Sequence, residues 1–342
     1  MTRNPIEEEI LAYVIPTNTE YAAAIAMGEK IITTVYEVAG IPAMMTGSVA
    51  RGTWVKGDKD IDIFMLFPPD LSREELQEKG LTVAYEVVKT FSGTAKEKYA
   101  EHPYLNAVIE GFDVDIVPCY NISSIVEMKC AVDRTPFHTR YLLPKITPIR
   151  EDVLLLKQFT KGGGIYGSDH MTGGFSGYLC ELLILAYGGF SEFIQAASKF
   201  HYGEVIDIEG YYPDTKIIRK KFFEPLVVID PTDKDRNVAA ALTSTRFTEF
   251  VELARNYCAK PNRIYFLSDP STRMNKAEFA KILQKRGTTV LAMRIETPSC
   301  VADTIVPQLR KSMDSIRSML ITEDFQVHRA EVSMGAEKSL IL

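Results

Sequence analysis

The sequence of 342 residues has no run of roughly 18 uncharged residues, the length that a membrane-spanning helix needs. Its start, MTRNPIEEEI, is acidic, whereas a secretory signal begins basic and continues apolar. The five cysteines are an odd, scattered set without a CxxC pair, so neither a disulfide framework nor a zinc module is indicated. These absences predict a cytoplasmic protein without a membrane partner.

The sequence also lacks an excess of basic residues. Its 39 lysine and arginine residues against 45 aspartate and glutamate residues give a net charge of -6. This balance argues against a protein that coats nucleic acid by bulk charge, although it is compatible with a local basic face. With 46% hydrophobic and 25% charged residues, the composition is that of a globular chain, and the length suggests two or three domains.

The pattern of apolar residues changes twice along the chain. Residues 1–145 alternate helix-like and strand-like segments and predict a mixed sheet with helices. Residues 146–260 predict a mostly helical central domain, and residues 261–342 predict a small α+β domain. The expected fold class is therefore α+β.

Several local signals are specific enough to be tested. Thr17 or Asn18 is expected to cap a helix that Gly40 ends, and Ser72 is expected to cap the next helix. The segment 178–200 belongs to the mostly helical stretch, and RIYFL at 263–267 reads as a strand.

Acidic residues occur at alternate positions in two apolar segments. Asp60 and Asp62 stand in DIDIF, and Asp113 and Asp115 stand in FDVDIV. In a strand, each pair places both carboxylates on one face. Carboxylates on a core strand need a compensating cation, and Mg²⁺ prefers such oxygens and leaves positions for phosphate. A single DxD is about as often a solvated strand end, but two pairs together favour a metal site.

A glycine-serine turn precedes the first acidic pair. In GSVARGTW, Gly47 permits a tight turn, and Ser48 offers an N–H and a hydroxyl to a phosphate. Arg51 lies one turn further on if a helix starts there. A phosphate cradle beside a metal site predicts a nucleoside triphosphate as ligand.

A glycine-serine pair, a DxD and a third acid on a later strand form the pattern of the nucleotidyltransferase superfamily related to DNA polymerase beta. The chain more specifically resembles the archaeal (class I) CCA-adding enzymes, the tRNA nucleotidyltransferases. The resemblance rests on seven ordered blocks: GSVARGTWVKGDKDIDIFMLFP, KYAEHPY, VDIVPCY, AVDRTPFHTRYL, LLLKQFTKGGGIYG, GFSGYLCELL and VIDPTDKDRNVAAAL.

The resemblance implies template-independent addition of C, C and A to the 3′ end of tRNA from CTP and ATP, with release of pyrophosphate. Asp60, Asp62 and Asp115 match the family's catalytic carboxylates, which hold two Mg²⁺ ions. For Asp113, a supporting electrostatic role and a solvated neighbour remain open.

The resemblance also implies a nucleotide-binding set. The residues that match family positions contacting the incoming nucleotide are Ser48, Arg51, His138, Lys157 and Tyr166. Arg236 matches an arginine that reads the base edge, where a guanidinium donates two hydrogen bonds. His102 is a weaker candidate for the same pocket. Taken singly, His138 and Lys157 would be an ordinary histidine and a solvated lysine.

The acceptor end of tRNA is the expected macromolecular partner. Basic and aromatic residues that could follow its phosphates are Tyr141, Arg140, Lys145, Arg219, Lys220 and Lys221, although a charge run is as often a solvated face.

The chain departs from the family at its C-terminal end. Family members continue into a tail domain, and this sequence is expected to stop partway into it, which puts full tRNA affinity in doubt. Two alternatives therefore stay open: an RNA adenylyltransferase that adds only A, and a tRNA-binding fragment with impaired catalysis. A homodimer also stays open.

Overall fold

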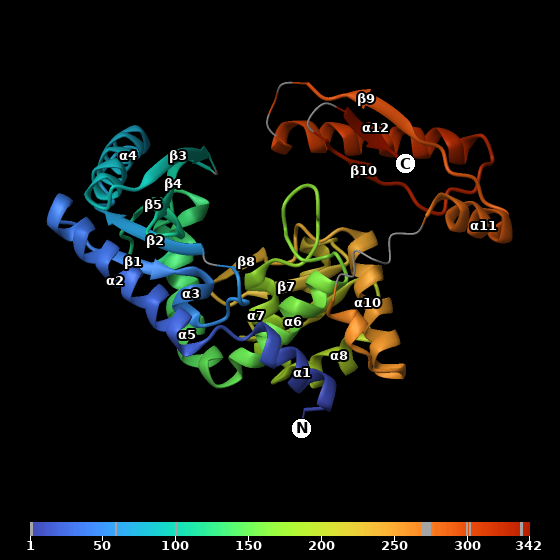
Figure 1. The fold of residues 1–342 in the computed structure, drawn as a ribbon, viewed down its shortest axis with the longest axis horizontal. Helices are drawn as coiled ribbons and strands as arrows, with labels where there is room; N and C mark the ends of the chain where they lie inside the picture. The colour runs from blue at the N-terminus through green and yellow to red at the C-terminus, as the bar shows by residue number, and fades with distance from the viewer. Residues whose placement is uncertain are drawn as a thin grey trace.

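The computed structural model shows an α+β protein, which confirms the expected fold class. It describes residues 3–58, 60–99, 101–267, 275–298, 300, 302–335 and 338–342. Three sheets follow one another along the chain, each in a different part of the molecule (Figure 1).

The first sheet has five strands in the order β1-β2-β5-β4-β3. Their bounds are β1 Ala43–Thr46, β2 Asp60–Phe67, β3 Thr94–Tyr99, β4 Pro103–Ile109 and β5 Phe112–Tyr120. The two central strands, β2 and β5, run parallel, and the other neighbours are antiparallel. The sheet is therefore mixed, as expected, and the two strands that carry the acidic pairs lie side by side.

Two long helices pack on one face of this sheet, α2 (Asn18–Ala39) and α4 (Arg73–Thr90). Thr17 caps α2 and Ser72 caps α4, each in a capping box with the glutamate three residues on, so the expected starts are confirmed. Apolar side chains of β2 and β5 form one core with both helices. The alternation of the strands consequently leaves the acidic side chains on the opposite face.

The central part is built from helices around an aromatic core. Its helices are α5 Thr135–Ile146, α6 Arg150–Gly162, α7 Gly177–Tyr187, α8 Phe190–Ala197 and α10 Ser244–Ala259, and α1 (Pro5–Val14) packs against α6. The expected helical character of 178–200 is confirmed, although it is divided between two helices. The chain breaks after α7, where Gly188 takes the left-handed conformation with φ 83°, and α8 leaves at 95° to α7.

The central part also contains a small sheet that the sequence did not predict. Its strands, in the order β6-β7-β8, are β6 Glu204–Ile206, β7 Leu226–Asp230 and β8 Asp233–Asn237, and α9 (Thr215–Lys221) lies beside them. Strand β7 is buried along its whole length. Short apolar runs such as LVVID are ambiguous between helix and strand, which explains the omission.

Short turns of helix connect these parts: α3 Gly47–Arg51, η1 Ile125–Glu127, η2 Ala131–Arg134, η3 Thr147–Ile149 and η4 Arg263–Tyr265. The strand expected over 263–267 is wrong, because η4 is a 3₁₀ turn whose following residue, Phe266, is fully buried in the aromatic core.

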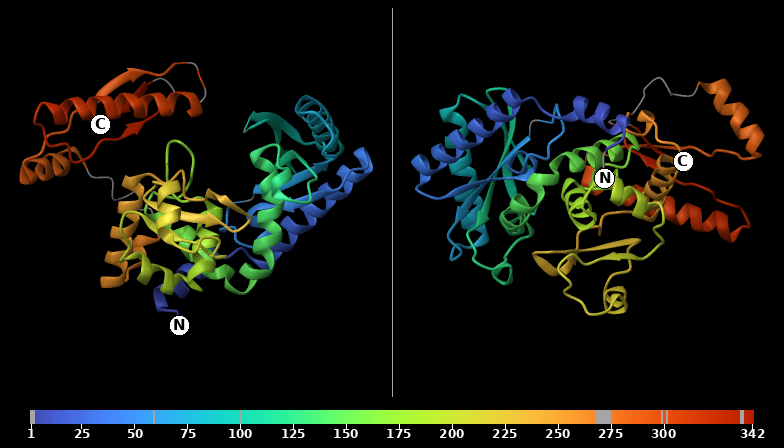
Figure 2. Two further views of the ribbon diagram at one scale, coloured as in Figure 1. Left: turned by 180° about the vertical axis from the view of Figure 1, so that it is seen from behind. Right: turned by 90° about the horizontal axis from the view of Figure 1, so that it is seen from below.

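A C-terminal module follows, with α11 Lys276–Arg286, β9 Met293–Glu296, α12 Ala302–Thr322, β10 Val332–Ser333 and β11 Lys338–Ile341. Its strands pair in the order β10-β11-β9. Figures 1 and 2 show the module over the central part and away from the first sheet. Arg310 donates to the carbonyl oxygen of Met171 at 3.1 Å, and Arg329 pairs with Glu249 at 2.9 Å, which ties the module to the central part.

Among the described residues, no single helix has the length and apolar composition to cross a membrane. Helices α7 and α8 reach that criterion only when taken together, across their 95° bend.

Candidate active site

Four carboxylates lie on the face of the first sheet that is turned away from α2 and α4. The parallel pairing of β2 and β5 sets Asp60 opposite Asp113 and Asp62 opposite Asp115. Asp62 and Asp115 are half-buried, whereas Asp60 and Asp113 are exposed. The prediction that each acidic pair shares one face of its strand is confirmed, and the pairing of β2 with β5 brings the two pairs together.

These carboxylates repel one another. Burial, and then the neighbouring charge of Asp115, raises the pKa of Asp62 to about 7. Burial, and then the charge of Asp113, also raises the pKa of Asp60. Arg51 and Lys157 oppose the shift at Asp62 without cancelling it. The face therefore has a surplus of negative charge that a cation would relieve.

These carboxylates fit a divalent metal whose remaining ligands come from water and from a substrate. Asp115 accepts a hydrogen bond from Asn106 Nδ2 at 2.6 Å, and Lys98 Nζ lies 3.9 Å from the same oxygen. Within the described ranges, no three Asp, Glu, His or Cys side chains converge as a ready metal site. Mg²⁺ usually takes one or two carboxylates and completes its shell with water and phosphate oxygens, so this geometry suits it.

The glycine-serine turn directly abuts the acids. Gly47 has φ 69°, and a Cβ at this position would lie 1.8 Å from Asp62 Oδ2. Only glycine therefore allows the backbone to pass so close to this carboxylate. The short helix α3 starts here, which places Ser48 in its first turn and Arg51 at its end, as the sequence predicted.

Arg51 is engaged in a buried ion pair. Its Nε donates to both oxygens of Glu181 at 3.0 and 3.1 Å, and its Nη2 lies 2.9 Å from Oε2 of the same residue. Its Nη1 donates to Thr139 Oγ1 at 3.0 Å. Glu181 is fully buried in α7, so the pair joins α3 of the first part to the central helices.

Lys157 belongs to the same buried cluster. Its Nζ donates to the carbonyl oxygen of Thr53 at 2.8 Å and lies 4.0 Å from Glu181 Oε1. Burial lowers the pKa of Lys157, and the charge of Glu181 opposes this. Burial would raise the pKa of Glu181, but the charges of Arg51 and then Lys157 hold it below its usual value.

Tyr166 lies beside this cluster. A Cβ on Gly177, at the start of α7, would lie 3.1 Å from the Tyr166 hydroxyl and 3.3 Å from Lys157 Nζ. Three of the predicted nucleotide-binding residues, Arg51, Lys157 and Tyr166, thus gather where the first sheet meets the central helices.

His138 and Arg236 meet at a second carboxylate, Asp230. His138 Nε2 lies 2.9 Å from Asp230 Oδ2, and Arg236 Nη1 donates to the same oxygen at 2.7 Å. The His138 ring stacks on Tyr178, with centroids 4.0 Å apart and an interplanar angle of 19°. The structure brings these two predicted nucleotide-binding residues together although they lie 98 positions apart in the sequence.

The sequence prediction missed three residues that organise these clusters: Glu181, Asp230 and Tyr178. Two of them carried a signal. Glu181 is the single charge in the helix GYLCELLILAY, and Asp230 ends the apolar strand LVVID. A charge in an otherwise buried element needs partners, so both positions could have been singled out.

His102 lies apart from the other predicted residues. It is 1% exposed and lines a cavity of about 130 Å³. The cavity's other lining residues are Leu71, Ser72, Arg73, Leu76, Tyr120, Lys129 and Cys130. None of the acids is among them.

Most of the predicted tRNA-contacting residues already have partners within the chain. Lys145 pairs with Glu209 at 3.2 Å and lies over the Tyr141 ring, whose hydroxyl donates to the same glutamate. Arg219 donates to the carbonyl oxygen of Glu224 at 2.9 Å. Lys221 pairs with Asp235, whereas Arg140 and Lys220 are exposed.

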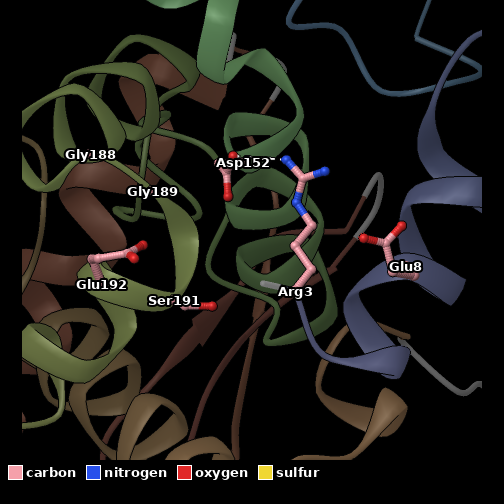
Figure 3. Close-up of a pocket in the computed structure, with 7 residues that line it drawn as sticks. All are labelled: Arg3, Glu8, Asp152, Gly188, Gly189, Ser191 and Glu192. Atoms are coloured by element: carbon pink, nitrogen blue, oxygen red, sulfur yellow. Dashed lines mark hydrogen bonds and ion pairs between the residues drawn. The ribbon is translucent and has the colours of Figure 1, made fainter. Parts of the chain in front are cut away.

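A larger cavity, of about 520 Å³, lies at the start of the chain and contains none of the predicted site residues (Figure 3). Arg3 stands between α1 and α6 and donates to Asp152 at 2.9 Å, and Gly188 and Gly189 form the opposite wall. Arg3 and Asp152 already pair with each other, so size alone does not make this cavity the reactive site.

Three family models match the chain in sequence order. They are described as nucleotidyltransferase domain (residues 30–141), tRNA nucleotidyltransferase, second domain (residues 151–267), and CCA-adding enzyme, C-terminal domain (residues 286–342).

Curated relatives match over nearly the whole chain. The CCA-adding enzyme of Methanoregula boonei is 46% identical over 341 residues, 99% of this chain and 73% of the relative. Those of Methanosarcina barkeri and Haloarcula marismortui are 41% and 40% identical, covering 97% and 94% of this chain and 73% and 68% of the relatives.

Solved structures show the same fold at low sequence identity. A cytoplasmic RNA terminal U-transferase gives a TM-score of 0.60 at 15% identity, covering 77% of this chain and 98% of that one. CdnC from E. coli MS115-1, solved with ATP, gives a TM-score of 0.57 at 16% identity, covering 77% of this chain and 93% of that one.

Replacing Asp62 by asparagine is expected to stabilise the metal-free protein at pH 8. Because the pKa of Asp62 is raised to about 7 in the fold, its favourable contribution belongs to the protonated form and is lost as the pH rises through 7. We expect a gain of roughly 1–2 kcal/mol at pH 8 and a smaller one at pH 5.5, after discounting for partial exposure. Denaturation in EDTA measures both values, with exposed Asp113→Asn as the control, and equal gains at both pH values would contradict the assignment.

Replacing Glu181 by glutamine is expected to destabilise the fold by about 3 kcal/mol, because two buried cations lose their anionic partner. Urea denaturation measures the loss. The matched control is Glu29→Gln on the exposed face of α2. A loss no larger than the control's would show that the cluster does not hold the two parts together.

Proposed function

The chain belongs to the family of CCA-adding enzymes, and from that premise we propose that its acidic face transfers nucleotides from CTP and ATP to the 3′ end of tRNA. The observation that carries the proposal is the register of β2 and β5, which sets Asp60 and Asp62 beside Asp113 and Asp115 next to the Gly47–Ser48 turn. A carboxylate face beside a phosphate-binding turn is the arrangement that nucleotidyl transfer requires.

The reaction adds C, C and then A without a nucleic-acid template. In each round the tRNA 3′-oxygen forms a bond to the α-phosphorus of the nucleotide, and the bond from that phosphorus to the bridging oxygen breaks. Pyrophosphate carries away the bonding electron pair, and the 3′-hydroxyl proton is released.

Asp60, Asp62 and Asp115 are the residues that would hold two Mg²⁺ ions. When bound, the metal lowers the pKa of the 3′-hydroxyl and neutralises charge on the leaving pyrophosphate. The carboxylates contribute negative charge, and burial together with the crowding of that charge raises the pKa of half-buried Asp62 to about 7 while no cation is bound. Asp113, being exposed, adds to the electrostatic field of the face without needing to touch the metal.

We assign binding of the triphosphate to Ser48, Arg51, Lys157 and Tyr166. Ser48 offers its hydroxyl and N–H from the first turn of α3. Arg51 and Lys157 are held in place by Glu181. We therefore assign them the role of fixed positive charges near the acids. Tyr166 adjoins Lys157 and would contribute its hydroxyl.

We assign contact with the base of the nucleotide to His138 and Arg236. The guanidinium of Arg236 keeps N–H groups beyond the one bonded to Asp230, and its side chain is 33% exposed. The tRNA acceptor end would reach the acids over exposed residues such as Arg140 and Lys220. This division assigns catalysis to residues 1–145, nucleotide selection to residues 146–260 with His138, and further RNA contact to residues 261–342.

Replacing Asp115 by asparagine is expected to lower the rate of nucleotide addition by at least ~10²-fold while tRNA binding is retained, because the change removes a metal ligand and little RNA surface. The assay uses tRNA transcripts ending before CCA, before CA and before A, with Mg²⁺ and each triphosphate alone and together. Products are resolved at single-nucleotide length, and exposed Glu86→Gln is the control.

Addition of C, C and A by the wild type, with no product from GTP or UTP, is the expected result. Addition of A alone would favour an adenylyltransferase instead. An Asp115→Asn variant with unchanged rate would overturn the assignment of the catalytic face.

A further inference from the structure

Asn106 contacts one of the catalytic carboxylates from the outer half of the first sheet. It stands on β4 directly opposite Asp115 on β5, and directly opposite residues of antiparallel strands share one face of the sheet. Asn106 is therefore on the acidic face, although the rest of β4 is largely apolar. Asparagine is uncommon in strands, so a half-buried asparagine at this register position needs a physical reason.

The contacts of Asp115 are unequally divided between its two oxygens. Asn106 Nδ2 donates to Oδ1 at 2.6 Å, and Lys98 Nζ lies 3.9 Å from the same atom. Lys98 comes from the edge strand β3, where it stands opposite Tyr104 of β4. Among the described residues, no hydrogen bond or ion pair reaches Oδ2, and this atom is not fully buried. Oδ2 is therefore available to a ligand from outside the chain.

The register places Asp115 between a donor and a second acid. Asp115 lies opposite Asn106 on one side and opposite Asp62, on the parallel strand β2, on the other. The two oxygens of a carboxylate point in different directions, and the hydrogen bond holds Oδ1 toward β4. Oδ2 is then the oxygen left for a cation that Asp115 shares with Asp62.

A hydrogen bond of this kind restricts the rotation of the carboxylate. The terminal torsion of an aspartate is broad, so without a partner Asp115 would sample several orientations. An amide donor removes this freedom without adding a charge, whereas a cation in the same place would repel the metal. Ligating carboxylates are commonly oriented by such partners, and loss of one costs roughly 10- to 100-fold in metal affinity or activity.

We propose that Asn106 is a positioning residue for the metal site: its amide group fixes the rotation of Asp115 so that Oδ2 faces the Mg²⁺ ion shared with Asp62. The proposal rests on the proposed function, because it takes Asp62 and Asp115 as metal ligands. It assigns no direct contact between Asn106 and either the metal or a substrate. The effect of Asn106 should therefore be the same for CTP and ATP.

The test is Asn106→Leu, which keeps a side chain of similar shape and removes the donor. We expect the apparent Kd for Mn²⁺, used as a probe in place of Mg²⁺, to rise by ~10- to 100-fold in the nucleotide-free protein. Electron paramagnetic resonance of the unbound Mn²⁺ measures this without turnover. In the tRNA extension assay the Mg²⁺ concentration for half-maximal rate should rise as well, and saturating Mg²⁺ should restore most of kcat.

Two other variants serve as controls. Asn256→Leu removes the same kind of bond, an amide donating to Glu252 at 3.1 Å, on the exposed surface of α10, and should leave the Mn²⁺ affinity unchanged. Lys98→Met removes the cation near Oδ1 and should leave the affinity unchanged or raise it, because less positive charge then opposes the metal. A loss at Lys98→Met as large as that at Asn106→Leu would overturn the proposal, because an ion pair rather than the amide would then hold Asp115.

A crystal structure of the wild type with Mn²⁺ provides a test that needs no variant. The anomalous signal is expected beside Asp115 Oδ2, with Asn106 still bonded to Oδ1. Metal on Oδ1 in place of the Asn106 contact would overturn the proposal, even if Asn106→Leu fails to fold.

The outcomes also separate this inference from the proposed function. Unchanged Mn²⁺ affinity in a folded Asn106→Leu variant would mean that Asn106 is merely structural, whatever the rate of extension. Mn²⁺ binding that depends on Asn106, in a protein that extends no tRNA, would support this inference and overturn the proposed function. A wild type that binds no Mn²⁺, even with CTP present, would overturn both.

Discussion

The buried contact between Glu181 and two cations is the constraint on which the site depends. Glu181 is fully buried, and Arg51 and Lys157 are 8% and 3% exposed. None of the three could be buried alone, because an unpaired charge in the interior is strongly unfavourable. They come from α7, α3 and α6, so satisfying Glu181 requires the first sheet to dock on the central helices in one orientation. The same docking places the carboxylates of β2 next to the central helices.

The molecule uses carboxylates in two opposite ways. Glu181 and Asp230 are surrounded by donors and cations, so they are ionised and rigid, and they orient other side chains. Asp60 and Asp62 lose solvent beside other carboxylates, and their pKa values rise. Carboxylates of the first kind stabilise the fold, whereas those of the second kind carry negative charge that a bound cation would neutralise. That contrast distinguishes an architectural acid from a reactive one without any ligand present.

The sequence predicted the parts of this design that depend on local pattern. The alternation in DIDIF and FDVDIV placed the acids on one face because a strand has a period of two, and capping boxes marked the starts of α2 and α4. It could not predict the partners of Arg51 and His138, which lie 130 and 92 residues away. It also missed the break at Gly188 and the sheet around β7, because apolar runs fit a buried helix and a buried strand equally well.

The separation of the two carboxylate hubs has a functional consequence. Glu181 holds cations and supplies a field that every nucleotide triphosphate would experience alike, whatever its base. Asp230 instead holds His138 and Arg236, the two residues proposed to contact the base. A change at the first hub should therefore act on stability and on all nucleotides together, whereas a change at the second should act on the choice among them. Glu181 and Asp230 have separate sets of partners, so a substitution at one leaves the contacts of the other in place.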